Sequence, residues 1–276
     1  SMKTCVLYIA SRRGRYCEDA VTSRNSVKAH NPKLPCILAT ENASGLSGWD
    51  RTLQMSPLRY PDMWYLDSTR WTNEAFNLLY DDYDAILILD TDTYCDAPLD
   101  EVFELTRRFD FCAVHESNRH TCRTVEPIPD SFPEVNIGVM VVATNEHVRN
   151  LFKDWLELYE AHPDIFLNND QGPLREALWI NKLLNMYILT EEFNCRFGFG
   201  VCVVSKVRIL LSRAAGFDSW RPGRRRVAPE DRRDPGESRL DPRQPRLGRR
   251  LALRGIRRAD RRSGGTLCRQ CRPRER

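Results

Sequence analysis

The sequence predicts a three-layer α/β domain built around a mostly parallel sheet. Short apolar segments alternate with amphipathic segments along residues 3–210, an order typical of strands alternating with helices. Residues 85–89 (AILIL) are apolar at every position, as a central strand covered on both faces requires. A chain of 276 residues, of which 41% are hydrophobic and 29% charged, can bury a core of this size.

The first ninety residues predict three strands and two helices. Ala75, Phe76 and Leu79 recur at helical spacing and indicate a helix from residue 72. Residues 41–68 contain several Gly and Pro residues, so we expect irregular structure there. The predicted strands are 3–10, 35–40 and 83–89, and the predicted helices are 15–30 and 72–83.

The following part of the chain continues the alternation. Asp100 and Glu101 would lie in the first turn of a helix, where acidic side chains suit the helix dipole. Asn145 is a predicted N-cap, and the helix after it carries an apolar stripe that we assign to the core, namely Val148, Leu151, Phe152, Trp155, Leu158 and Tyr159. The other predicted helices are 99–108 and 169–182, and the predicted strands are 111–114, 135–143, 186–190 and 206–211.

The charge divides the chain near residue 212. Residues 1–212 hold 21 Lys and Arg against 30 Asp and Glu, a net charge of −9. Residues 213–276 hold 21 Arg, no Lys and 8 acidic residues, a net charge of +13. We therefore expect a folded domain at 1–212 and a separate Arg-rich tail at 213–276, which we expect to be disordered.

The sequence of the tail allows two interpretations. One is a basic arm for nucleic acid or anionic lipid headgroups. The other is an out-of-frame translation of a GC-rich coding region, which the abundance of Arg without Lys favours, so we do not expect nucleic acid as a partner. Cys268 and Cys271 form a single CxxC, from which we expect no zinc site.

Cysteine usage and hydropathy bear on the compartment. The ten cysteines are irregularly spaced and no export signal is recognisable, which favours free thiols in a reducing compartment. No apolar run approaches the roughly 20 residues that span a bilayer. We expect a cytoplasmic protein without a transmembrane segment.

Two carboxylates follow the most apolar strand. Asp90 and Asp92 would point to the same side of an extended backbone, at the end of a strand where open α/β sheets bind their ligands. Such a pair repels unless it is neutralised, and a hard divalent cation such as Mn²⁺ or Mg²⁺ is the usual partner. The alternative is a pair of solvated turn residues.

Two enzyme families place carboxylates in this way. In haloacid-dehalogenase-like phosphatases Asp90 would be the nucleophile, but here Tyr94 stands at the fifth position of their motif and the pair comes late in the chain. The segments ILILDTDTYCDAPLDEVFEL, PEVNIGVMVVATNE and NNDQGPLREAL together resemble GT-A glycosyltransferases of the glycogenin-like family 8 and the bacterial nucleotide-diphospho-sugar transferases. This resemblance covers roughly residues 3–210 and implies their GT-A (Rossmann-like) nucleotide-diphospho-sugar transferase fold.

The resemblance implies a donor site at the ends of the first and central strands. Asp90 and Asp92 would bind the metal and, through it, the diphosphate of the nucleotide-sugar. Ala10 and Ser11 would face the nucleotide base. Arg70 matches a basic position that contacts the donor, although it could instead pair with an acid on the surface.

The resemblance also implies a sugar pocket. Asn136 and Gly138 would line it, and Asp170 and Gln171 would contact the sugar as catalytic residues. The plainer alternatives are a strand bulge at Gly138 and a helix N-cap at Asp170. Asn136, a polar residue in an apolar strand, needs a partner in any case.

The expected function is metal-dependent transfer of a hexose from a nucleotide-sugar, by resemblance UDP- rather than GDP-linked, with retention of configuration. The acceptor could be a glycan, a lipid or a small molecule. Leu211 stands where the family has a histidine as third metal ligand, so we expect weaker metal binding and impaired activity in this chain. A binding protein that uses the basic tail is the non-enzyme alternative.

Overall fold

The computed structural model describes residues 2–116, 122–196, 203 and 205–211. The predicted tail at 213–276 lies outside the described residues, so both interpretations of it and the domain boundary stay predictions. Within the described residues, no helix is both long enough and apolar enough to cross a membrane.

A seven-stranded sheet forms the centre of the fold. The parallel pairs are β3–β2, β2–β1, β1–β4 and β6–β8, whereas β7 runs antiparallel to both its neighbours, β4 and β6. The sheet is therefore mostly parallel, as the sequence predicted. In spatial order its strands are β3 (Arg51–Gln54), β2 (Cys36–Thr40), β1 (Thr4–Ile9), β4 (Ala85–Leu89), β7 (Val135–Ala143), β6 (Phe111–His115) and β8 (Met186–Leu189).

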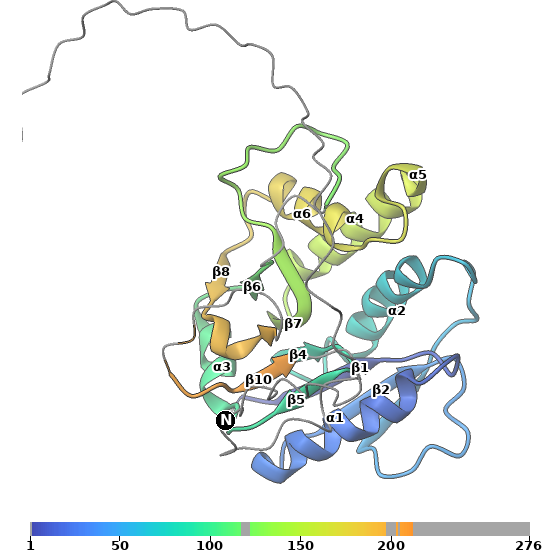
Figure 1. Ribbon diagram of the computed structural model, residues 1–276, viewed down its shortest axis with the longest axis vertical. Coiled ribbons are helices and arrows are strands. Elements are labelled where there is room, and N and C mark those ends of the chain that lie inside the picture. The colour runs from blue at the N-terminus through green and yellow to red at the C-terminus, as the bar shows by residue number, and fades with distance from the viewer. Residues whose placement is uncertain (1, 117–121, 197–202, 204, 212–276) are drawn as a thin grey trace, which may run out of the picture. The chain divides into compact units, whose positions relative to one another are not determined.

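Helices cover both faces of this sheet. On one face α2, α4 and α6 pack beside one another (Figure 1). On the other face α1 and α3 contribute Ala20, Val27, Val102 and Phe103 to a second core. The helices are α1 (Tyr16–His30), α2 (Trp64–Leu79), α3 (Asp100–Glu104), α4 (Glu146–Ala161), α5 (Pro163–Phe166) and α6 (Gln171–Ile180), with 3₁₀ turns at Leu105–Arg107 and Glu191–Phe193.

The period of two in the strands explains the three layers. In β1, Leu7 packs against the core of α2 and α4, whereas Val6 and Tyr8 pack against the core of α1. Every residue of β4 is buried because both faces are covered. The fully apolar run that predicted a central strand is thus accounted for.

A second, three-stranded sheet follows the carboxylate pair. Its strands, in spatial order, are β5 (Thr93–Cys95), β10 (Ile209–Leu211) and β9 (Cys195–Arg196). β10 pairs antiparallel with β5, so that Leu211 lies opposite Thr93. This pairing brings the end of the described chain next to the loop that carries Asp90 and Asp92.

The prediction of irregular structure at 41–68 was wrong in two places. β3 escapes the pattern because it is an edge strand in which only Leu53 is buried. Helix α2 begins at Trp64, eight residues before the predicted start, because its first turns bury a charged pair, Asp67 and Arg70, that hides the apolar period. The short strand β5 was also missed.

The predicted N-cap of α4 is confirmed and gives a test of the fold. Asn145 Oδ1 accepts from Val148 N at 3.0 Å, and Asn145 Nδ2 donates to Asp110 Oδ1 at 2.7 Å. We expect Asn145→Ala to lower the free energy of unfolding by about 1–2 kcal/mol in urea titrations. Asn77→Ala, the same change at an exposed position of α2, should alter it by less than about 0.5 kcal/mol. Equal losses would contradict the capping role.

Candidate active site

The carboxylate pair lies in the tight loop between β4 and β5. Asp90 is exposed and Asp92 is half-buried. The carbonyl oxygen of Asp90 accepts from Thr93 Oγ1 at 2.8 Å, and Thr93 Oγ1 in turn lies 2.7 Å from Ser23 Oγ of α1. Tyr8 of β1 extends this chain of buried hydroxyls, since its OH lies 3.0 Å from Ser23 Oγ. The loop is therefore fixed to β1 and α1 beneath it.

Gly138 lies against Asp90 on the neighbouring strand. Asp90 N donates to Gly138 O at 2.9 Å. A Cβ atom at residue 138 would lie 3.0 Å from Asp90 Oδ2, 3.0 Å from Asn136 Oδ1 and 2.8 Å from Leu211 Cδ2. Four positions that the sequence singled out thus meet at one point, and a side chain at residue 138 would require the side chain of Leu211 to shift.

The predicted bulge is present at the same place. The register between β6 and β7 shifts at Ala113/Val114, with Ala113 opposite Met140 and Val114 opposite Asn136. Residues 137–139 of β7 are the extra length. Bulges often redirect side chains next to functional sites, so the bulge is compatible with the sugar-pocket role that the resemblance implies for Gly138, and that role stays a prediction.

Asn136 finds its partners in a buried polar cluster. Asn136 Nδ2 donates to Glu116 Oε2 at 2.8 Å, and Asn136 Oδ1 accepts from Gly138 N at 3.0 Å and from Asn194 Nδ2 at 2.7 Å. Glu116 also forms an ion pair with Arg196 of β9. We call these residues, together with Gln171, the polar cluster: Glu116, Asn136, Gln171, Asn194 and Arg196.

Gln171, a predicted catalytic residue, joins this cluster from α6. With its amide nitrogen assigned toward the acceptors, Gln171 donates to Glu116 Oε2 at 3.0 Å and to Val135 O at 2.9 Å. Glu116 is 3% exposed and contacts three members of the cluster. Its role was not predicted from the sequence, because a single acidic residue after a strand resembles a solvated residue until its partners are known.

Asp170 does not cap helix α6 with its side chain. Asn169 Oδ1 accepts from Gln171 N at 3.0 Å and from Gly172 N at 3.2 Å instead. The Asp170 residue is 5% exposed, and burial, together with the negative charge of Asp90, raises the pKa of its carboxyl well above the usual value. The protonation of its carboxyl group is therefore sensitive to charge near Asp90.

Ala10 and Ser11 lie where β1 ends. Ser11 Oγ donates to Glu41 Oε1 at 2.9 Å, and Arg12 N donates to the same carboxylate at 3.0 and 3.1 Å. Ala10 N continues the sheet by donating to Ala39 O at 3.0 Å. Glu41, at the end of β2, thus orders the end of β1.

A pocket opens next to Ser11, and we call it the β1-end pocket. The rings of Tyr16 and Trp64 stack there with centroids 5.3 Å apart, and Arg13 Nη1 donates to Pro61 O at 3.2 Å. Aromatic faces beside a guanidinium suit a flat heterocyclic ring. The pocket is lined by Ser11, Arg13, Tyr16, Leu58, Tyr60, Pro61 and Trp64.

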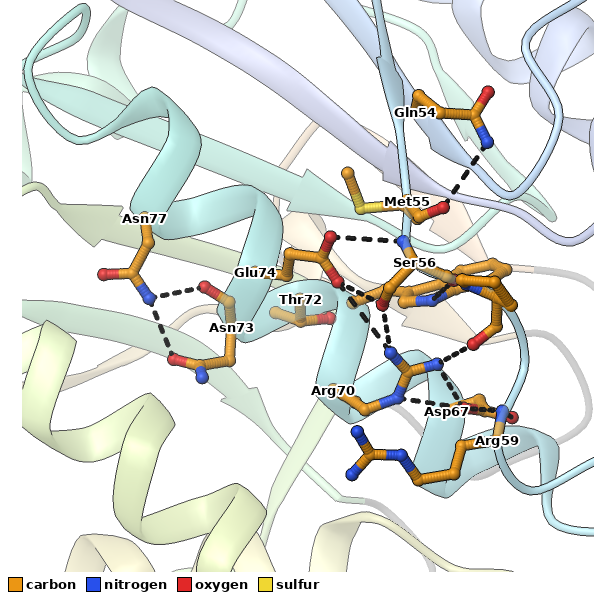
Figure 2. Close-up of polar contacts among 12 residues, drawn as sticks. Gln54, Met55, Ser56, Arg59, Asp67, Arg70, Thr72, Asn73, Glu74 and Asn77 are labelled. Carbon is orange, nitrogen blue, oxygen red and sulfur yellow. Dashed lines mark hydrogen bonds and ion pairs between the residues drawn. The ribbon is translucent and has the colours of Figure 1, made fainter.

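Arg70 has protein partners on several sides. Figure 2 shows its guanidinium between Ser56, Asp67 and Glu74. The pairing with an acid that the sequence allowed is present, although it is buried rather than on the surface. The predicted contact with a donor stays a prediction.

The donor set at Asp90 and Asp92 suits one kind of cation. No group of three or more His, Cys, Asp or Glu side chains is placed to hold a metal within the described ranges. The apolar Leu211 lies beside Asp90 instead. Mg²⁺-type sites commonly use one or two carboxylates, with water and substrate phosphate oxygens completing the shell, so the residues fit such a cation.

The close approach at Gly138 can be tested by stability alone. We expect Gly138→Ala to lower the free energy of unfolding by about 1–3 kcal/mol, because the added methyl group overpacks the site. In a Leu211→Ala background the nearest clash is gone, so the cost should fall by at least about 0.5 kcal/mol. Equal costs in the two backgrounds would show that Leu211 and Gly138 are not in contact.

Solved structures of glycosyltransferases share this architecture. The galactosyltransferase LgtC in complex with donor and acceptor sugar analogs aligns with a TM-score of 0.54 and 15% identity, over 75% of this chain and 86% of its own. A structure of an active-site mutant of LgtC gives the same values. Mouse xyloside xylosyltransferase 1 in its apo form aligns with a TM-score of 0.53 and 14% identity, over 77% and 98% of the two chains. No protein-family model and no curated protein sequence matches the chain. The chain has the GT-A fold that its sequence motifs predicted.

Proposed function

We propose that this chain is a metal-dependent glycosyltransferase that moves a hexose from a nucleotide-sugar to an acceptor. The supporting observation is the order of features along one edge of the sheet. Ser11 of the β1-end pocket follows β1, Asp90 and Asp92 follow β4, and Asn136 of the polar cluster lies on β7, so the three features meet the sheet at three neighbouring strands. Adjacent strands lie about 4.8 Å apart, so this row spans roughly 10 Å.

A nucleotide-sugar has matching features in the same order. Its flat base suits the β1-end pocket, where Tyr16 and Trp64 offer ring faces and Arg13 and Ser11 offer donors. Its diphosphate falls at the end of β4, and its hydroxyl-rich sugar falls at the polar cluster. A base with carbonyl acceptors agrees with the guanidinium of Arg13, and by resemblance the donor is UDP- rather than GDP-linked.

Asp90 and Asp92 would hold Mn²⁺ or Mg²⁺ together with the diphosphate. The cation offsets the negative charge that the leaving nucleoside diphosphate gains. The backbone contacts of Asp90 with Gly138 and Thr93 fix the loop before any ligand arrives. The protein therefore contributes a preorganised carboxylate pair rather than a complete coordination shell.

Asp170 and Gln171 would act on the sugar. As the sugar–phosphate bond breaks, the sugar gains positive charge, which nearby carboxylate and amide oxygens stabilise. Glu116 orients Gln171 and Asn136 from behind. We propose retention of configuration by resemblance and assign no separate base. The acceptor is a glycan, a lipid or a small molecule.

The GT-A architecture supports this function over a haloacid-dehalogenase-like phosphatase with Asp90 as nucleophile. The two also predict different chemistry, since a phosphatase would form an aspartyl-phosphate that beryllium fluoride mimics. The alternative of a nucleic-acid-binding protein depends on the Arg-rich tail, which lies outside the described residues.

Calorimetric titration of UDP and of GDP, each with and without Mn²⁺, tests the site. We expect UDP to bind only with Mn²⁺, and we expect Asp90→Asn/Asp92→Asn to weaken this binding by more than about a hundredfold, because the cation loses both protein charges. Asp81→Asn/Asp164→Asn removes two exposed carboxylates elsewhere and should bind as the unaltered chain does. Mn²⁺-dependent binding that survives in the Asp90/Asp92 variant would contradict the assignment.

Leu211 offers a gain-of-function test. Its place beside Asp90 and Gly138 is where a third ligand would complete the pair. We expect Leu211→His to tighten Mn²⁺ binding, measured by the electron paramagnetic resonance of free Mn²⁺, by about tenfold. Leu183→His places a histidine on a leucine that is 79% exposed and should change nothing. Equal gains in the two variants would mean that the histidine binds Mn²⁺ on its own.

A further inference from the structure

A buried carboxylate holds the backbone of the loop that walls the β1-end pocket. Asp67, in the first turn of α2, is fully buried. Its carboxylate accepts from Arg59 N at 3.0 and 3.1 Å and from Tyr60 N at 2.8 Å. Arg59 and Tyr60 stand between Leu58 and Pro61 in the chain, and Leu58, Tyr60 and Pro61 all line the pocket. By holding these two backbone amides, Asp67 fixes the backbone of one wall of the pocket.

Arg70 completes this arrangement from the next turn of the helix. Arg70 Nη2 donates to Asp67 Oδ1 at 2.6 Å and to Pro57 O at 2.7 Å, and Arg70 Nη1 donates to Ser56 Oγ. The guanidinium thus neutralises Asp67 and binds the start of the loop that contains Arg59 and Tyr60 (Figure 2). Only the forked guanidinium reaches these acceptors at once.

The wall has further attachments that leave it little freedom. Trp71 Nε1 donates to Ser56 O at 2.9 Å, and Tyr60 OH donates to Glu160 Oε1 of α4 at 3.0 Å. On the pocket side, Arg13 reaches Pro61 O. The loop is therefore held from α2, from α4 and from the end of β1.

We infer that the Asp67–Arg70 pair positions the wall of the β1-end pocket for the base of the nucleotide, so that Arg70 acts on nucleotide affinity without touching the nucleotide. This inference rests on the proposed function, because it takes the base as the occupant of the pocket. Because the wall is already ordered, binding of the base loses less conformational entropy than it would with a mobile wall. Loosening it raises the dissociation constant of the nucleotide while the Asp90–Asp92 site stays intact.

The chain contains a matched control for this idea. Arg175 and Arg70 are equally buried, each 8% exposed. Arg175 also binds a loop through carbonyl oxygens, because it donates to Pro129 O and to Phe132 O at 3.1 Å. Its loop does not line the β1-end pocket. Arg70→Lys and Arg175→Lys therefore disturb comparable structural clamps, of which only one holds the pocket.

The experiment titrates UDP with Mn²⁺ into the full chain and each variant, and measures thermal unfolding in parallel. We expect both variants to lose thermal stability, but only Arg70→Lys to raise the dissociation constant of UDP, by at least about fivefold. Hydrogen exchange at Arg59 N and Tyr60 N should quicken in Arg70→Lys alone. Ser56→Ala, a milder change that removes one acceptor of Arg70, should raise the dissociation constant in the same direction by about twofold.

Each outcome decides between a positioning and a merely structural role. An unchanged dissociation constant in Arg70→Lys, with thermal stability reduced, overturns the inference and leaves the proposed function standing. A rise of equal size in Arg175→Lys also overturns it. If Arg70→Lys does not fold, Ser56→Ala decides in its place. If the unaltered chain binds neither UDP nor GDP with Mn²⁺, the proposed function fails and the inference with it.

Discussion

The candidate site depends on one backbone contact, the hydrogen bond from Asp90 N to Gly138 O at 2.9 Å. β7 runs antiparallel to β4. The first residues of β7 therefore lie at the same edge of the sheet as the end of β4, where Asp90 follows. The bulge at 137–139 then turns Asn136 beside Asp90. A parallel strand in that position would have placed Asn136 at the opposite edge of the sheet.

The charged member of the polar cluster, Glu116, is costly to bury unless an ion pair and hydrogen bonds compensate its charge. An isolated charge such as that of Glu116 would be strongly unfavourable at 3% exposure, and here Arg196, Asn136 and Gln171 compensate it. Such networks are rigid, because losing one member strands the others. The buried charge of Glu116 would destabilise the fold if it were unpaired. The hydrogen bonds that compensate it also fix the orientation of Asn136 and Gln171.

Apolar patterning predicted the layers of the fold and most helices and strands, because a run of apolar residues such as β4 indicates burial without reference to any other part of the chain. It failed wherever burial depends on a partner distant in sequence. Asp67 and Arg70 look like surface residues until the loop at 55–60 closes over them, which is why α2 was predicted to begin too late. Glu116 escaped for the same reason. Asp90, Asn136 and Gly138 could be predicted as site residues because a motif, unlike a distant partner, is visible in one sequence.

Within the proposed function, cation and nucleotide must bind together. Asp90 and Asp92 concentrate negative charge at the end of β4, and burial together with the charge of Asp90 raises the pKa of the Asp170 carboxyl, which favours its neutral form. A diphosphate alone would add to this repulsion, and a cation alone would find, among the residues that the structure describes, no group of three or more candidate ligands to complete its shell. Each ligand supplies what the other lacks, so each strengthens the binding of the other by the same factor. Leu211 makes this coupling stronger, because an apolar side chain beside Asp90 leaves more of the coordination shell to the phosphate oxygens.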